Sequence, residues 1–104
     1  MLDLRHPPPP ERGEALRRRF AARLGADRPY GGSGVWRYRE LVMPGVEAPV
    51  THPEGNTPLL SRRAVAAWAG VADLLLKHEG HNPTGSFKDR GMTVGMTQIG
   101  RAHV

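Results

Sequence analysis

The sequence predicts an α/β domain, and three observations lead to this class. Apolar residues recur at helical spacing between residues 11 and 24. A short apolar run with the length of a strand, DLLLKHE, occupies residues 73–79. Turn-forming residues follow that run, and a stretch compatible with a helix comes after them. A helix, a strand, a loop and a helix in succession are the opening of an α/β domain.

Length and composition limit the classes of protein. With 104 residues, 38% of them hydrophobic, the chain suits one small domain with a modest core. Its 13 Gly and 10 Pro predict a large share of turns and irregular structure. No apolar run is long enough for a membrane span, the N-terminus has no signal-peptide core, and cysteine is absent. We therefore expect a cytoplasmic protein that makes no membrane contact.

The net charge of +5 raises the question of nucleic-acid binding. The basic residues concentrate in one early segment, which also carries acidic residues. The aromatic residues are scattered and are not interleaved with the basic ones, as a base-stacking platform requires. We expect a solvated arginine face and no nucleic-acid partner.

The N-terminal third is expected to hold a tail, a helix and a loop. Residues 1–10 form a proline-rich tail, and residues 11–32 contain the first helix and the loop after it. Leu16, Phe20 and Leu24 recur every four residues on the apolar side of this helix. A glycine directly after Leu24 is the expected C-terminal cap.

Two short helices are expected in the middle of the chain. The first covers residues 35–44, with Ser33 as its cap and a proline as its stop. The second covers residues 61–70, beginning at Ser61 and ending at Gly70.

Two strands and a last helix complete the expected elements. Residues 57–60 begin a short strand, and residues 73–79 form a buried strand, covered on both faces. The leucine content of residues 73–79 leaves a helix as the alternative. Ser86 caps a final helix that runs from Phe87 into the high 90s. Methionines at 92 and 96, one turn apart on that helix, are expected to pack in the core.

Lys88 is the candidate for chemistry. It lies in the first turn of its helix, where unpaired backbone N–H groups disfavour the ammonium form and favour the neutral amine. A neutral lysine amine attacks carbonyls and forms Schiff bases. Thr84, Gly85 and Ser86 offer close backbone approach and hydroxyl groups, and Phe87 offers apolar surface. The alternative is a solvated lysine beside an ordinary capping serine.

The neighbours of Lys88 receive supporting roles. Asp89 and Arg90 are expected to pair with the wall of the site and to fix the start of the helix. His78, Glu79 and His81 are close in sequence, but no further ligand follows at metal-binding spacing, so no metal site is expected.

The segment EGNTPLL, at residues 54–60, contributes two further candidates. Asn56 and Thr57 are candidates to approach the active site. A structural turn into the strand is the preferred interpretation of Thr57 and the proline after it.

EGNTPLL (54–60) followed by LLLKHEGHNPTGSFKDRGM (74–92) closely resembles the N-terminal part of the fold-type II pyridoxal phosphate enzymes, the tryptophan synthase β-like group. Within this group the combination of EGNTPL and GSFKDRGM is typical of threonine synthases, and WRYRELVMP resembles their leading segment. The resemblance covers residues 33–98, which we expect to be the N-terminal part of the cofactor-dependent domain.

This resemblance implies a function. Lys88 would be the catalytic residue and would carry pyridoxal 5'-phosphate as a Schiff base, with Ser86 and Phe87 also in the cofactor site. The enzyme would be a lyase that converts O-phospho-L-homoserine and water to L-threonine and phosphate. The full-length protein would be a homodimer, and this chain would be an inactive N-terminal fragment of it.

Two other functions remain open at this point. One is another enzyme of the same fold, such as a serine/threonine dehydratase, in which an apolar residue usually follows the Schiff-base lysine. EGNTPL and Asp89 disfavour this alternative. The other is a small basic binding protein without catalysis, which would make the lysine motif a coincidence.

The last six residues, IGRAHV at 99–104, have a separate explanation. They match the translation of a DNA string common in sequencing-library adapters. We expect them to be a non-native tail.

Overall fold

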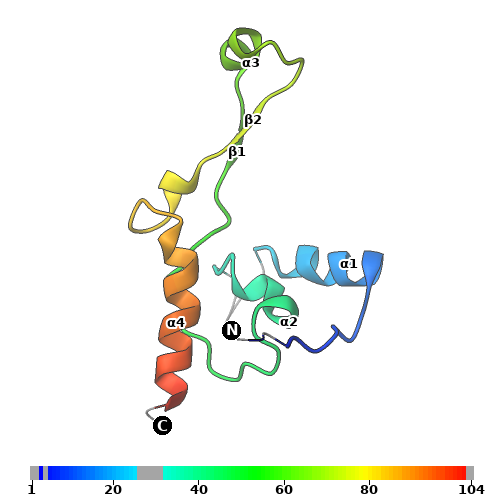
Figure 1. The fold of residues 1–104 in the computed structure, drawn as a ribbon, viewed down its shortest axis with the longest axis vertical. Helices are drawn as coiled ribbons and strands as arrows, with labels where there is room; N and C mark the ends of the chain where they lie inside the picture. Colours follow the sequence, from blue (N-terminus) through cyan, green and yellow to red (C-terminus); the bar gives the residue numbers. More distant parts are fainter. Residues whose placement is uncertain (1–2, 4, 26–31, 103–104) are drawn as a thin grey trace.

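A computed structural model describes residue 3, residues 5–25 and residues 32–102. Residues 27–31 of the loop predicted at 27–34 lie outside these described ranges. Figure 1 shows a helical unit, an arm of two strands with a helix at its tip, and a long last helix. The elements are α1 (Gly13–Arg23), the 3-10 helix η1 (Trp36–Tyr38), α2 (Arg39–Val42), β1 (Leu59–Ser61), α3 (Arg63–Ala69), β2 (Leu75–Lys77), the 3-10 helix η2 (Glu79–His81) and α4 (Lys88–Ala102). This mixture of helices and strands is consistent with part of an α/β domain.

Helix α1 packs on η1 through the apolar side that its spacing predicts. Leu16 and Phe20 are buried, and the Phe20 ring meets the Tyr38 ring edge-on at 4.8 Å. The prediction for Leu24 is wrong, because the helix ends at Arg23 and leaves this side chain exposed. Gly25 adopts a positive φ of 74° directly after the end, as a terminating glycine does.

The arginine face of α1 is exposed as predicted, with one exception. Arg23 donates from both terminal nitrogens to the Glu40 carboxylate, and from Nη1 to the Arg37 carbonyl at 2.7 Å. The hydrogen bonds from Arg23 lower the pKa of Glu40 to about 2. This ion pair joins α1 to α2.

The expected helix at 35–44 is a 3-10 turn followed by a single α-helical turn. The hydroxyl of Ser33 accepts the Trp36 N–H at 2.9 Å, but Val35 occupies the N-cap of η1, so the expected cap was placed two residues too early. Trp36 is completely buried, and its indole N–H donates to the Val50 carbonyl at 2.8 Å. The helix ends at Val42, two residues before the proline that was expected to stop it.

The arm is a two-stranded antiparallel ribbon that extends away from the other elements (Figure 1). Leu59 pairs with Lys77 at one end of the ribbon. Each strand is shorter than the apolar run that predicted it. The expectation of a buried strand at 73–79 is wrong for this structure. Among the described residues β2 has one neighbouring strand, and no layer formed by them covers its side chains, so Leu75 is 57% exposed.

Helix α3 sits at the tip of the arm. Its start was misplaced, because Ser61 is the last residue of β1 and Arg62 occupies the N-cap without a side-chain bond. Its end is confirmed: Gly70 takes the left-handed conformation with φ of 74°.

Helix α4 begins at Lys88, one residue later than expected, and continues to Ala102 beyond the predicted end in the high 90s. Its buried Thr97 hydroxyl accepts the N–H of Val50 at 2.8 Å. The prediction that Met92 and Met96 pack in the core is wrong, since about half of each side chain is exposed. No helix in the described ranges is long and apolar enough to span a membrane.

Candidate active site

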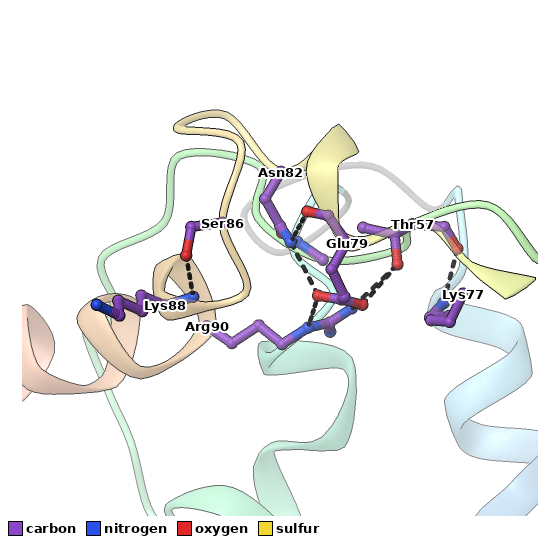
Figure 2. A network of polar contacts seen from close by, with 8 residues as sticks. Thr57, Lys77, Glu79, Asn82, Ser86, Lys88 and Arg90 are labelled. Carbon is purple, nitrogen blue, oxygen red and sulfur yellow. Dashed lines mark hydrogen bonds and ion pairs between the residues drawn. The ribbon is translucent and has the colours of Figure 1, made fainter.

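Lys88 is the first residue of α4, and its backbone is fixed by the serine that the sequence indicated. Ser86 Oγ accepts the Lys88 N–H at 3.2 Å, which confirms the capping role. The Lys88 side chain is exposed, and in Figure 2 it points away from the polar cluster behind the helix. Phe87, the other expected cofactor contact, is also exposed.

Asp89 closes the loop that precedes α4. Its carboxylate accepts the Thr84 N–H at 2.8 Å and the Thr84 hydroxyl at 2.6 Å. These two hydrogen bonds lower the pKa of Asp89. The carboxylate is buried, with His52 Nε2 at 4.0 Å from Oδ1. Asp89 therefore holds the turn that leads into Lys88, which confirms its expected role at the helix start.

Arg90 is clamped by Glu79 on the opposite side of the helix start. Arg90 Nε and Nη2 lie 3.0 and 2.8 Å from the two carboxylate oxygens, a bidentate pair (Figure 2). The Thr57 hydroxyl donates to Glu79 at 2.8 Å and accepts from Arg90 at 3.3 Å. Hydrogen bonds from Arg90 and then from Thr57 lower the pKa of Glu79 to about 2. Thr57 thus has the structural role preferred from the sequence.

Asn82 joins this pair to the EGNTPLL segment. Its side-chain oxygen accepts the Gly55 N–H at 2.7 Å, and its amide nitrogen donates to the Glu79 carbonyl at 2.8 Å and carboxylate at 2.9 Å. Asn82 is buried, and three of its hydrogen-bonding positions are used. Loop 54–57, η2 and α4 are therefore one connected polar network.

The first residue of the EGNTPLL segment, Glu54, anchors the segment through a buried carboxylate. Glu54 is completely buried and accepts hydrogen bonds from the Ser33 hydroxyl, the Thr51 hydroxyl at 2.5 Å and the His52 N–H at 3.3 Å. Burial raises its pKa, but the bonds from Ser33 and Thr51 outweigh this, so the net shift is downward. Asn56, two residues after Glu54, has a positive φ of 48° and an exposed side chain.

Lys77 and Lys88, the lysines of the chain, are in different situations. Lys77 Nζ donates to the Thr57 carbonyl at 2.6 Å (Figure 2). The Lys88 ammonium makes no hydrogen bond or ion pair with any residue that the structure describes. Both lysines are exposed, so they differ in whether the amine has a partner among the described residues and not in their exposure.

A hollow of about 260 Å³ lies beside the first turns of α4. Met92 and Met96 contribute to its apolar side, which is where their exposed surface faces. Its lining consists of Val50, His52, Thr84, Asp89, Met92, Thr93 and Met96. No three histidine or acidic side chains converge as metal ligands within the described ranges.

The sequence missed the partners of the polar network. Asp89 and Arg90 were expected to pair with the wall of the site and to fix the helix start, but Glu79 and Asn82 were not recognised as the groups that hold Arg90 and Gly55. Glu79 had been considered only as part of an improbable metal site. The position of Glu79, directly after a strand and before an Asn-Pro turn, marks it as a candidate, but no local pattern identifies Arg90 as its partner.

The family model for pyridoxal-phosphate dependent enzymes matches residues 50–103, which include loop 54–57, the arm and Lys88. The chain belongs to this family of pyridoxal-phosphate-dependent enzymes. Members of the family use pyridoxal phosphate as cofactor, and an accessible lysine amine at the start of a helix fits a cofactor that is held through its aldehyde.

Curated relatives agree with this family. The chain is 55% identical over 64 residues to "Threonine synthase" of Methanosarcina acetivorans, and 48% identical over 66 residues to "Threonine synthase" of Methanocaldococcus jannaschii; each match covers 62% of the chain. It is 41% identical over 93 residues, 86% of the chain, to "Threonine synthase 2, chloroplastic" of Arabidopsis thaliana. These matches span 16–18% of the relatives' length. No solved structure matches the chain.

Proposed function

We propose that this chain is the N-terminal part of a threonine synthase, which converts O-phospho-L-homoserine and water to L-threonine and phosphate. The observation that carries the proposal is the accessible Lys88 amine at the start of α4, inside a segment similar to proteins named threonine synthase. The complete protein would have the tryptophan synthase β-like fold, act as a homodimer and reside in the cytoplasm.

In this proposal Lys88 has two tasks. Pyridoxal phosphate supplies an aldehyde that condenses with amines and a ring that withdraws electrons from the bound substrate. Lys88 would hold the cofactor through its amine, and the same amine would accept and return protons at the substrate's α and β carbons. Ser86 keeps the lysine backbone in place through its 3.2 Å hydrogen bond, and Phe87 offers apolar surface beside it.

Asp89 supports this assignment over a dehydratase. Its buried carboxylate receives both the N–H and the hydroxyl of Thr84, and an apolar residue at this position could accept neither. The loop before Lys88 is therefore built around an acid.

The test uses the full-length gene product that carries this segment. Borohydride reduction of the holoenzyme and peptide mapping should place the pyridoxyl group on Lys88, and incubation with O-phospho-L-homoserine should release threonine and phosphate. Lys88→Arg should abolish turnover, because guanidinium stays protonated and cannot replace the amine. A label on Lys77 would refute the lysine assignment, and deamination of L-threonine without phosphohomoserine turnover would indicate a dehydratase.

A further inference from the structure

We propose that Glu79 is a positioning residue for Lys88, and that it acts through Arg90. The inference rests on the proposed role of Lys88 as the cofactor-bearing residue. In Figure 2 Glu79 lies apart from Lys88, and its carboxylate holds the guanidinium of Arg90, two residues further along α4.

The helix geometry explains how a clamp on Arg90 sets the direction of Lys88. With 3.6 residues per turn, side chains two positions apart differ by about 200° around the axis. Arg90 therefore points into the network while Lys88 points outward, as Figure 2 shows. A bidentate ion pair fixes the guanidinium in both angle and distance, so it also fixes the rotation of the first turn of α4.

The surrounding residues restrict the clamp to one geometry. Gly55 has a positive φ of 74°, and a Cβ atom there would lie 2.8 Å from Arg90 Nη1. The absence of a side chain at Gly55 thus makes room for the guanidinium. Asn82 holds the Gly55 N–H in turn, so Arg90 is confined by the backbone of loop 54–57 as well as by Glu79.

The same network affects the two lysines differently. The Thr57 hydroxyl donates to Glu79, and the Thr57 carbonyl accepts from Lys77 Nζ. Thr57 therefore takes part both in the clamp that directs Lys88 outward and in the hydrogen bond that engages the Lys77 amine. Glu79 favours Lys88 as the lysine that meets the cofactor.

The test compares Glu79→Gln with Glu40→Gln in the full-length gene product. Glu40 is a matched control, because it forms a bidentate pair with Arg23 between α1 and α2, and its pKa is also lowered to about 2. Glu79→Gln should weaken pyridoxal phosphate binding about 10-fold, and lower kcat roughly 10- to 100-fold with little change in KM. It should also reduce the yield of borohydride label on Lys88. Glu40→Gln should change only the melting temperature.

A double-mutant cycle tests whether Glu79 acts through Arg90. Glu79→Gln/Arg90→Gln should bind the cofactor no more weakly than the poorer of the two single variants, since both remove the same clamp. Thr57→Val, which keeps the ion pair and removes only the hydroxyl, should shift binding in the same direction by a smaller factor, and it serves if Glu79→Gln does not fold.

Three results would overturn the inference: cofactor affinity in folded Glu79→Gln equal to that of Glu40→Gln, additive effects in the cycle, or unchanged affinity in Thr57→Val. The proposed function is judged separately by the unsubstituted protein. A wild-type label away from Lys88 refutes that function, whereas a wild-type label on Lys88 with an unaffected Glu79→Gln refutes only the positioning role.

Discussion

At the scale of single residues, the backbones of Gly34 and Gly55 lie directly against each other. A Cβ atom on Gly34 would be 2.7 Å from the Gly55 Cα and 2.8 Å from its carbonyl carbon. The Gly34 N–H also donates to the Glu54 carbonyl at 2.6 Å. The atoms in the way belong to the backbone, so no side-chain rotation can relieve the contact.

Gly34→Ala should therefore destabilise the full-length protein by about 1–3 kcal/mol, the usual cost of forcing an extra group into a packed site. Denaturant unfolding measures the change. Gly95→Ala is the matched control, because a Cβ at this helical position meets nothing within 4 Å and alanine favours a helix. Equal midpoints for Gly34→Ala and the unsubstituted protein would contradict the argument.

Residue-scale features that depend on near neighbours could be predicted from the sequence. The Ser86 cap and the Gly70 helix end involve residues two to four positions apart, and both are confirmed. The Glu79–Arg90 pair and the Ser33–Glu54 bond join positions 11 and 21 apart, and no local pattern specifies such partners. Lys88 is proposed from its motif, whereas the groups that fix its helix depend on how the segments meet.

At the scale of elements, the arm differs from the helical unit in how its apolar residues are placed. Trp36 in η1 is completely buried, whereas Trp68 on α3 is 89% exposed. A two-stranded ribbon by itself is at best marginally stable in water. The arm therefore carries apolar surface that its own residues do not cover.

The two tryptophans give this difference a direct measurement in the 104-residue chain. Acrylamide should quench the fluorescence of the unsubstituted chain in two components, one readily accessible and one shielded. Trp68→Phe should remove the accessible component and shift the emission to shorter wavelength, because the remaining indole is buried and bonded to Val50. Quenching of the Trp68→Phe chain as readily as free tryptophan would contradict the placement of Trp36.

The strand predictions succeeded in position and failed in environment. The apolar run at 73–79 does contain β2, because strand propensity is a local property. Its burial depends on other strands and helices, and the sequence of the run cannot say whether those neighbours are present. Ser61 was misread for a similar reason, since a serine before an apolar helix suits both a strand end and a cap.

At the scale of the whole molecule, the chain is extended for its length. Its radius of gyration is 16.5 Å, whereas a compact domain of this size would have about 13 Å. The buried apolar side chains among the described residues are Leu16, Phe20, Val35, Trp36 and Ala66. So small a core supports little cooperativity.

We therefore predict that the purified 104-residue chain melts weakly and without a cooperative transition, and releases no phosphate from O-phospho-L-homoserine. Exposed apolar strands with open edges favour partial disorder or aggregation. Differential scanning calorimetry and a phosphate assay against free pyridoxal phosphate provide the measurement. A sharp melt together with threonine formation faster than the free cofactor allows would show the prediction to be wrong.

The two hydrogen bonds of the Val50 backbone give the chain an order of assembly during synthesis. The Val50 carbonyl accepts from Trp36, 14 residues earlier, and its N–H donates to Thr97, 47 residues later. At about 5–20 residues per second, roughly 2 to 10 seconds of translation separate Val50 from Thr97. Throughout this interval the Val50 carbonyl can accept from Trp36. The Val50 N–H must hydrogen-bond to water until Thr97 has been synthesised. Helix α4 then docks on a segment whose Val50 carbonyl is already hydrogen-bonded to Trp36 in the N-terminal helices.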